Sequence, residues 1–186
     1  MGWLALYVRS RRVLVSLAAL VICVVVLCLA LGDAWSPRFA AIVFGSAIAM
    51  AGAGLSGQDL DLDRTAAFGW PPRRLGHILL LGAVTVGAAL AVQSVGDVQL
   101  ETAWIVREAA GLMGLTGLAA TFFGGYFCWI LPLGWVLMAQ FVPGKPGLQD
   151  MLAWPTLSAE NPTAWLMAGA LFLVGTATYT AVGARR

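Results

Sequence analysis

Long apolar runs without charge constrain this chain more than any other feature. The clearest run is VLVSLAALVICVVVLCLAL, which extends from Val13 to Leu31. A helix rises 1.5 Å per residue, so about 20 apolar residues span the hydrocarbon core of a bilayer. Of the 186 residues, 60% are hydrophobic and 11% are charged, whereas soluble domains have about 25% charged residues. The sequence therefore predicts that lipid surrounds most of the molecule.

Six such runs can be recognised along the chain. Helices are expected in all of them, because the strands of a membrane barrel would alternate polar and apolar residues. Gly124-Gly125 marks a turn between the fourth and fifth runs, and Pro132 is expected to kink the fifth helix. The prediction is an all-α polytopic membrane protein that forms a single transmembrane domain over residues 1–186, with six transmembrane helices at about 13–31, 39–55, 78–95, 103–123, 126–142 and 163–183.

The distribution of Lys and Arg predicts the orientation. One side receives Arg9, Arg11, Arg12, Arg64, Arg73, Arg74, Arg185 and Arg186, and the other receives Arg38, Arg107 and Lys145. Eight basic residues against three place both termini and residues 56–77 in the cytoplasm. Residues 1–11 are expected to form an N-terminal interfacial helix, because Trp3, Leu6 and Tyr7 can share one helical face.

The loop from Ser56 to His77, SGQDLDLDRTAAFGWPPRRLGH, is unusually rich in charge for this chain. Residues 58–68 contain no internal Gly or Pro, and Ser56 or Asp59 could cap a short helix there. Pro71-Pro72 is expected to end that helix. This pattern favours a rigid cytoplasmic element suited to docking another protein, although a merely solvated loop is the simpler alternative.

The loop and the overall layout resemble the membrane subunit (permease) of an ABC transporter of the ABC-2 class, also called the type V exporter class. In DLDRTAAFGWPPRRLGHILLL, Asp63 and Arg64 are similar to the family's acidic-Arg pair, and Pro72, Arg73 and Arg74 to its later part. The resemblance implies that these residues, with Asp59, form the loop that contacts the ATPase. It also implies export of a hydrophobic or peptidic substrate, cytoplasmic ABC ATPase subunits as partners, and a second permease copy or related subunit.

The chain itself is not expected to be an enzyme. It contains no G-x-x-x-x-G-K-[ST] motif, so ATP and Mg²⁺ would be held by the partner ATPase, with no cofactor in this chain. No basic patch suggests nucleic-acid binding. The predicted location is the plasma membrane of a bacterium, as a multi-pass protein in contact with membrane lipid.

Two other functions remain open from the sequence. Asp59, Asp61 and Asp63 could hold Mg²⁺ against a diphosphate, as in intramembrane prenyltransferases. Those enzymes need a second Asp-rich motif, and here Asp97 and Asp150 are isolated. The other alternative is a structural or regulatory membrane subunit that transports nothing.

Charged residues at the start of the fourth run form a candidate outer gate. Glu101, Arg107 and Glu108 could act there, but pairing with neighbours or snorkelling to water are equally simple roles. Gly111, Gly114 and Gly117 are expected to serve close helix packing within the subunit.

The positions of the tryptophans and cysteines also allow predictions. Four tryptophans near predicted span ends fit interfacial belts; they are Trp35, Trp70, Trp104 and Trp165. Cys23, Cys28 and Cys128 lack the Cys/His spacing of a metal site and are interpreted as small buried apolar side chains.

Overall fold

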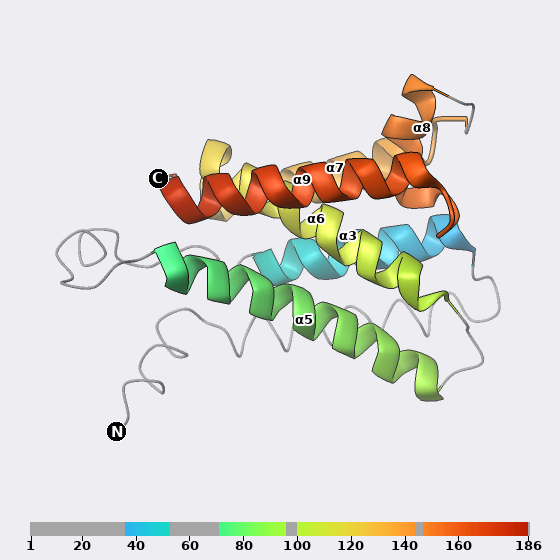
Figure 1. Cartoon of the computed structure of the whole chain (residues 1–186), viewed down its shortest axis with the longest axis horizontal. Coiled ribbons are helices and arrows are strands. Elements are labelled where there is room, and N and C mark those ends of the chain that lie inside the picture. The colour runs from blue at the N-terminus through green and yellow to red at the C-terminus, as the bar shows by residue number, and fades with distance from the viewer. Residues whose placement is uncertain (1–35, 53–70, 96–99, 144–146, 186) are drawn as a thin grey trace, which may run out of the picture.

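The computed structural model describes residues 36–52, 71–95, 100–143 and 147–185. All regular elements in these ranges are helices, which confirms the all-α prediction for this part of the chain. In order they are α3 (Pro37–Gly52), α5 (Pro71–Val95), α6 (Thr102–Phe123), the 3₁₀ turn η2 (Gly125–Phe127), α7 (Ile130–Ala139), α8 (Leu148–Ala153), the 3₁₀ turn η3 (Trp154–Thr156) and α9 (Pro162–Val182). Figure 1 shows the long helices arranged along the longest axis of the molecule.

Helix α6 forms the centre of the bundle, and α9 lies against it in the same chain direction. The two backbones approach so closely at Gly114 and Gly175 that neither position has room for a side chain. A Cβ atom on Gly175 would lie 1.9 Å from the carbonyl oxygen of Gly114, and one on Gly114 would lie 2.2 Å from that of Leu171. Gly117 likewise faces the backbone of Gly175. The prediction that these glycines serve packing within the subunit is therefore confirmed for Gly114 and Gly117.

The prediction of six transmembrane helices is wrong for the structure as described. Among the described residues, two helices are long and apolar enough to cross a membrane by length and composition, Pro71–Ala91 and Pro162–Val182. The predicted span 39–55 corresponds to α3, which has 16 residues, and the span 126–142 to α7, which has 10. The span at 103–123 corresponds to α6, whose first half contains the charged side chains of Arg107 and Glu108.

The shortening of the fifth predicted span has a local cause. Gly124 has φ 91°, a left-handed conformation that ends α6. Residues 125–127 then form a 3₁₀ turn, and α7 does not begin until Ile130. Pro132 therefore lies in the first turn of α7, where its missing N–H costs no helical hydrogen bond, and the predicted kink is absent.

Several predictions lie outside the described residues. They are the interfacial helix at 1–11, the span at 13–31, and most of the charged loop at 56–77, including its predicted helix at 58–68. The remainder of that loop is helical, because α5 begins at Pro71 and includes the whole of residues 71–77. Pro71-Pro72 thus lies in the first turn of a helix, where proline is well tolerated; whether it also ends the predicted helix at 58–68 concerns residues outside the described ranges.

The bundle has two chemically different ends. The start of α5 and the end of α9 meet at one end, because Arg74 Nη1 lies 3.5 Å from the carbonyl oxygen of Thr180. The end of α6 joins them there, since the backbone N–H of Arg185 donates to the Ala120 carbonyl at 2.9 Å. We call this the basic end, after Arg73, Arg74 and Arg185. The opposite end, which we call the acidic end, holds Glu101, Asp150 and Glu160.

Candidate functional site

Arg107, two turns into α6, is the centre of the densest polar network in the described part of the chain. Its Nη2 donates to the carbonyl oxygens of Leu157, at 2.7 Å, and Trp154, at 3.3 Å. Its Nη1 donates to the carbonyl of Ser158. A guanidinium group presents its N–H donors in a rigid planar fork, so one side chain can hold several carbonyls at once. Arg107 thereby fixes the irregular segment between α8 and α9 against α6.

Glu108 balances the charge of Arg107 inside the protein. The Oε1 atom of Glu108 lies 3.2 Å from Arg107 Nη2, and both side chains are 0% exposed. A buried charge is strongly unfavourable without a partner and hydrogen bonds. The second carboxylate oxygen, Oε2, has no hydrogen-bond partner among the described residues. The buried carboxylate of Glu108 therefore depends on Arg107 for its compensation. The same guanidinium also binds the three carbonyls.

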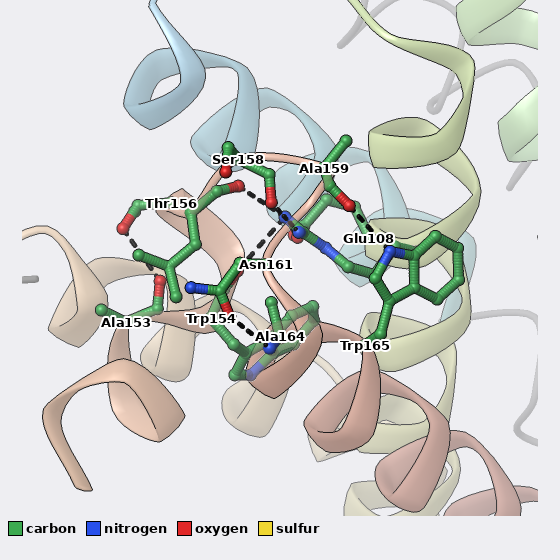
Figure 2. A network of polar contacts seen from close by, with 11 residues as sticks. Glu108, Ala153, Trp154, Thr156, Ser158, Ala159, Asn161, Ala164 and Trp165 are labelled. Carbon is green, nitrogen blue, oxygen red and sulfur yellow. Dashed lines mark hydrogen bonds and ion pairs between the residues drawn. The ribbon is translucent and has the colours of Figure 1, made fainter. Parts of the chain in front are cut away.

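The segment that Arg107 holds is ordered by its own short-range contacts. Thr156 Oγ1 donates to the Ala153 carbonyl at 2.9 Å, and Trp165 Nε1 donates to the Ala159 carbonyl at 2.8 Å. Asn161 caps α9, because its Oδ1 accepts the backbone N–H of Ala164 at 3.1 Å. Figure 2 shows these contacts together, with the segment from Ala153 to Trp165 folded around the charged pair.

Trp154 attaches this segment to the core. Its side chain is 0% exposed and lies on Gly111, one turn after Arg107 in α6. A Cβ atom on Gly111 would lie 2.4 Å from Cη2 of the indole, so only glycine leaves room for the ring. The network therefore stabilises the acidic end. It joins α6, η3 and the start of α9 through the ion pair, the hydrogen bonds to backbone carbonyls and the packing of the buried indole ring.

The three residues predicted as an outer gate lie in different environments. Arg107 and Glu108 pair inside the protein, so the alternative in which they snorkel to water is wrong. Glu101 is exposed at the N-cap position of α6 and makes no side-chain cap hydrogen bond. Movement of this region as a gate stays a prediction.

The residues predicted to contact an ATPase are only partly described. Asp59, Asp63 and Arg64 lie outside the described residues. Pro72, Arg73 and Arg74 lie in the first turns of α5, at the basic end. Besides its contact with Thr180, the Arg74 guanidinium covers Gly183, where an added Cβ would be 2.6 Å from Cζ. A cation placed at the C-terminal end of α9 is favourable because the last carbonyls of a helix carry partial negative charge.

The cysteines and tryptophans singled out in the sequence have different outcomes, and Cys128 and Trp104 serve packing. Cys128 is buried, as expected, and lies against Gly52, whose added Cβ would be 3.0 Å from the sulfur. Trp104 is 4% exposed and packs edge-on against Phe44, so its assignment to an interfacial belt is wrong. Trp165 is 41% exposed. Trp35, Trp70, Cys23 and Cys28 lie outside the described residues, within which no group of metal-binding side chains occurs.

The partners of Arg107 could not be identified from the sequence. The sequence marks residues 143–162 only as a polar, turn-rich segment with one tryptophan, and the acceptors are backbone carbonyls that carry no sequence signal. Comparison of the chain with protein-family models, curated proteins and solved structures gave no match.

Proposed function

We propose that this chain is a membrane-embedded helical subunit that works with a separate ATPase, as the permease of an ATP-driven exporter of the ABC-2 class. The observation that carries the membrane part is the apolar exterior of α5 and α9. In each helix only 22% of the most apolar 18-residue window is buried. The core helix of a water-soluble bundle would be mostly buried, because exposed apolar surface costs about 25 cal/mol per Å² in water.

The exposed side chains on α9 illustrate the point. Four apolar side chains of this helix are each more than half exposed: Leu166, Leu173, Val174 and Val182. The helix contains no charged residue. A surface of this kind is suited to acyl chains. We therefore propose the cell membrane as the location, and the Lys/Arg distribution favours an orientation with the basic end toward the cytoplasm.

The exporter part of the proposal rests on the resemblance of residues 61–81 to the coupling loop of ABC-2 permeases. The position of Arg73 and Arg74 at the basic end is compatible with it, because α5 begins there next to the C-terminal end of α9. ATP hydrolysis by the partner would move the coupling loop, and α5 would transmit the movement into the bundle. The substrate is proposed to be hydrophobic or peptidic.

Recovery of a partner from native membranes tests this proposal. The tagged wild-type chain is purified in mild detergent beside Asp63→Ala/Arg64→Ala, and the ATPase activity of each preparation is measured. We expect an ABC ATPase to accompany the wild type and to be lost from the variant. The matched control is Glu160→Ala, an exposed charge at the acidic end, which should retain the partner. Absence of an ATPase from all three preparations would contradict the exporter assignment.

A structural subunit without transport activity is the second candidate. The backbone contact between Gly114 and Gly175 favours it, because it packs α6 and α9 directly against each other. The two candidates differ in ATP turnover. If the copurified ATPase works at the same rate with and without the chain, the chain is a structural partner; dependence of the rate on Asp63 supports the permease.

A further inference from the structure

Five large aromatic side chains are exposed together where α6 turns into α7. We call this cluster the aromatic corner; it consists of Phe122 (58% exposed), Phe123 (49%), Tyr126 (81%), Phe127 (44%) and Trp129 (44%). The rings of Tyr126 and Phe127 pack edge to face with centroids 5.1 Å apart. All five side chains lie within eight residues of one another along the chain, and two of them, Tyr126 and Trp129, carry a polar group on an otherwise apolar ring.

The aromatic corner lies at the basic end of the bundle. Ala120, one turn before Phe123, accepts the hydrogen bond from the backbone of Arg185, whose side chain is exposed. Arg74 lies over Gly183, two residues before Arg185. In Figure 1 the yellow turn that follows α6 lies close to the C-terminus. Exposed rings and three of the five described arginines thus occupy the same end, while the four described acidic residues lie toward the other end together with Arg38 and the buried Arg107 (Figure 1).

The sequence around the corner favours an apolar or interfacial environment for this surface. From Ala109 to Gly144 the chain contains no charged residue. A solvent-facing turn is normally polar, whereas rings with a polar edge are enriched where a bilayer meets water. Anionic headgroups attract nearby Lys and Arg side chains.

We propose that the aromatic corner is an interfacial anchor that lies in the headgroup layer of an anionic phospholipid leaflet, with Arg185 beside it facing the lipid phosphates. This inference rests on the proposed membrane location. It adds the depth of the corner in the bilayer, the end of the molecule that contacts the headgroups and the charge of the preferred lipid. It also replaces the belt position predicted for Trp104, which is buried.

Fluorescent depth measurement tests the anchor. In a chain without cysteine, made by replacing Cys23, Cys28 and Cys128 with Ala, a single cysteine is introduced as Tyr126→Cys or as Leu173→Cys. Leu173 is the matched control because it is 68% exposed in the middle of α9. Each site receives an environment-sensitive fluorophore in phosphatidylcholine vesicles that contain phosphatidylglycerol. Spin-labelled lipids with the nitroxide at the headgroup or deep in the acyl chain serve as quenchers.

We expect the label at position 126 to be quenched more strongly by the shallow nitroxide, and the label at 173 by the deep one. No quenching at 126 with deep quenching at 173 would overturn the anchor and leave the membrane proposal intact, because the corner would then lie outside the bilayer. Deep quenching at 126 would also overturn it. No quenching at either site would overturn the membrane location itself.

The lipid charge is tested with the same labelled chain. Headgroup-labelled phosphatidylglycerol should quench position 126 more strongly than headgroup-labelled phosphatidylcholine at equal content. Arg185→Gln should reduce that difference, because a neutral side chain no longer concentrates the anionic lipid. Equal quenching by the two lipids in the unsubstituted chain would overturn the preference for anionic lipid.

Discussion

At the scale of single residues, Arg107 is the side chain on which the acidic end depends most. Arg107→Ala would leave Glu108 buried without its partner and would remove the donor from three carbonyls, those of Trp154, Leu157 and Ser158. Breaking a buried ion pair from one side costs about 3–5 kcal/mol. We expect a loss of that order in the free energy of unfolding, measured by denaturant titration of the detergent-solubilised chain.

Two further variants test whether loss of the ion pair causes the destabilisation expected for Arg107→Ala. Arg38→Ala removes an exposed arginine at the start of α3 and should change the unfolding free energy by less than about 0.5 kcal/mol. Arg107→Met/Glu108→Leu removes both charges and should be more stable than Arg107→Ala alone, because no unpaired ion remains. If the double variant is as unstable as the single one, the carbonyl contacts matter more than the pair.

At the scale of elements, the contact between α6 and α9 depends on glycine. Gly175→Ala would place a methyl carbon 1.9 Å from the carbonyl oxygen of Gly114, so the helices would have to move apart. Overpacking of this kind costs about 1–3 kcal/mol. Gly169→Ala is the matched control in the same helix, since an added Cβ there meets nothing within 4 Å. It should be neutral or should stabilise by about 0.5 kcal/mol through helix propensity, as thermal unfolding of both variants would show.

The start of α9 provides a second prediction at this scale. Asn161→Ala removes the side-chain oxygen that accepts the N–H of Ala164. Loss of such an N-cap costs about 1 kcal/mol. Asn161→Asp should retain most of that stability, because a carboxylate also accepts the hydrogen bond and complements the helix N-terminus. Equal stability of Asn161→Ala and the wild type in denaturant titration would show that the cap contributes nothing.

At the scale of the whole molecule, the two ends should face opposite sides of a membrane. A cysteine introduced at Arg185 and one at Glu160 lie at the basic and the acidic end, and both positions are exposed. In sealed vesicles, a membrane-impermeant maleimide should label only one of the two, and permeabilisation should expose the other. Labelling of both positions in sealed vesicles would contradict the arrangement in which α9 crosses the bilayer.

The sequence predicted the helical class and several boundaries of the described part, because apolar runs and glycine turns are local signals. The turn at Gly124 and the helix from Pro162 are examples. The helical start at Pro71 was not predicted, because a proline pair is compatible with the first turn of a helix as well as with a position after one. The role of Arg107 could not be predicted, since its acceptors are backbone carbonyls brought near by the fold. Among the described residues the number of spans was overestimated, in the case of α7 because hydropathy does not show that a 3₁₀ turn shortens the apolar run.

The carbonyl contacts of Arg107 also bear on the order in which the protein can assemble. They join parts of the chain that are 47 to 51 residues apart. While the chain is being synthesised, α6 is complete long before Trp154 exists, and until then Arg107 and Glu108 have only each other and whatever water reaches them. A completed α6 is thus poorly suited to an apolar environment until α8 and η3 arrive. We therefore expect the chain from α6 to α9 to become stable in one late step and not helix by helix.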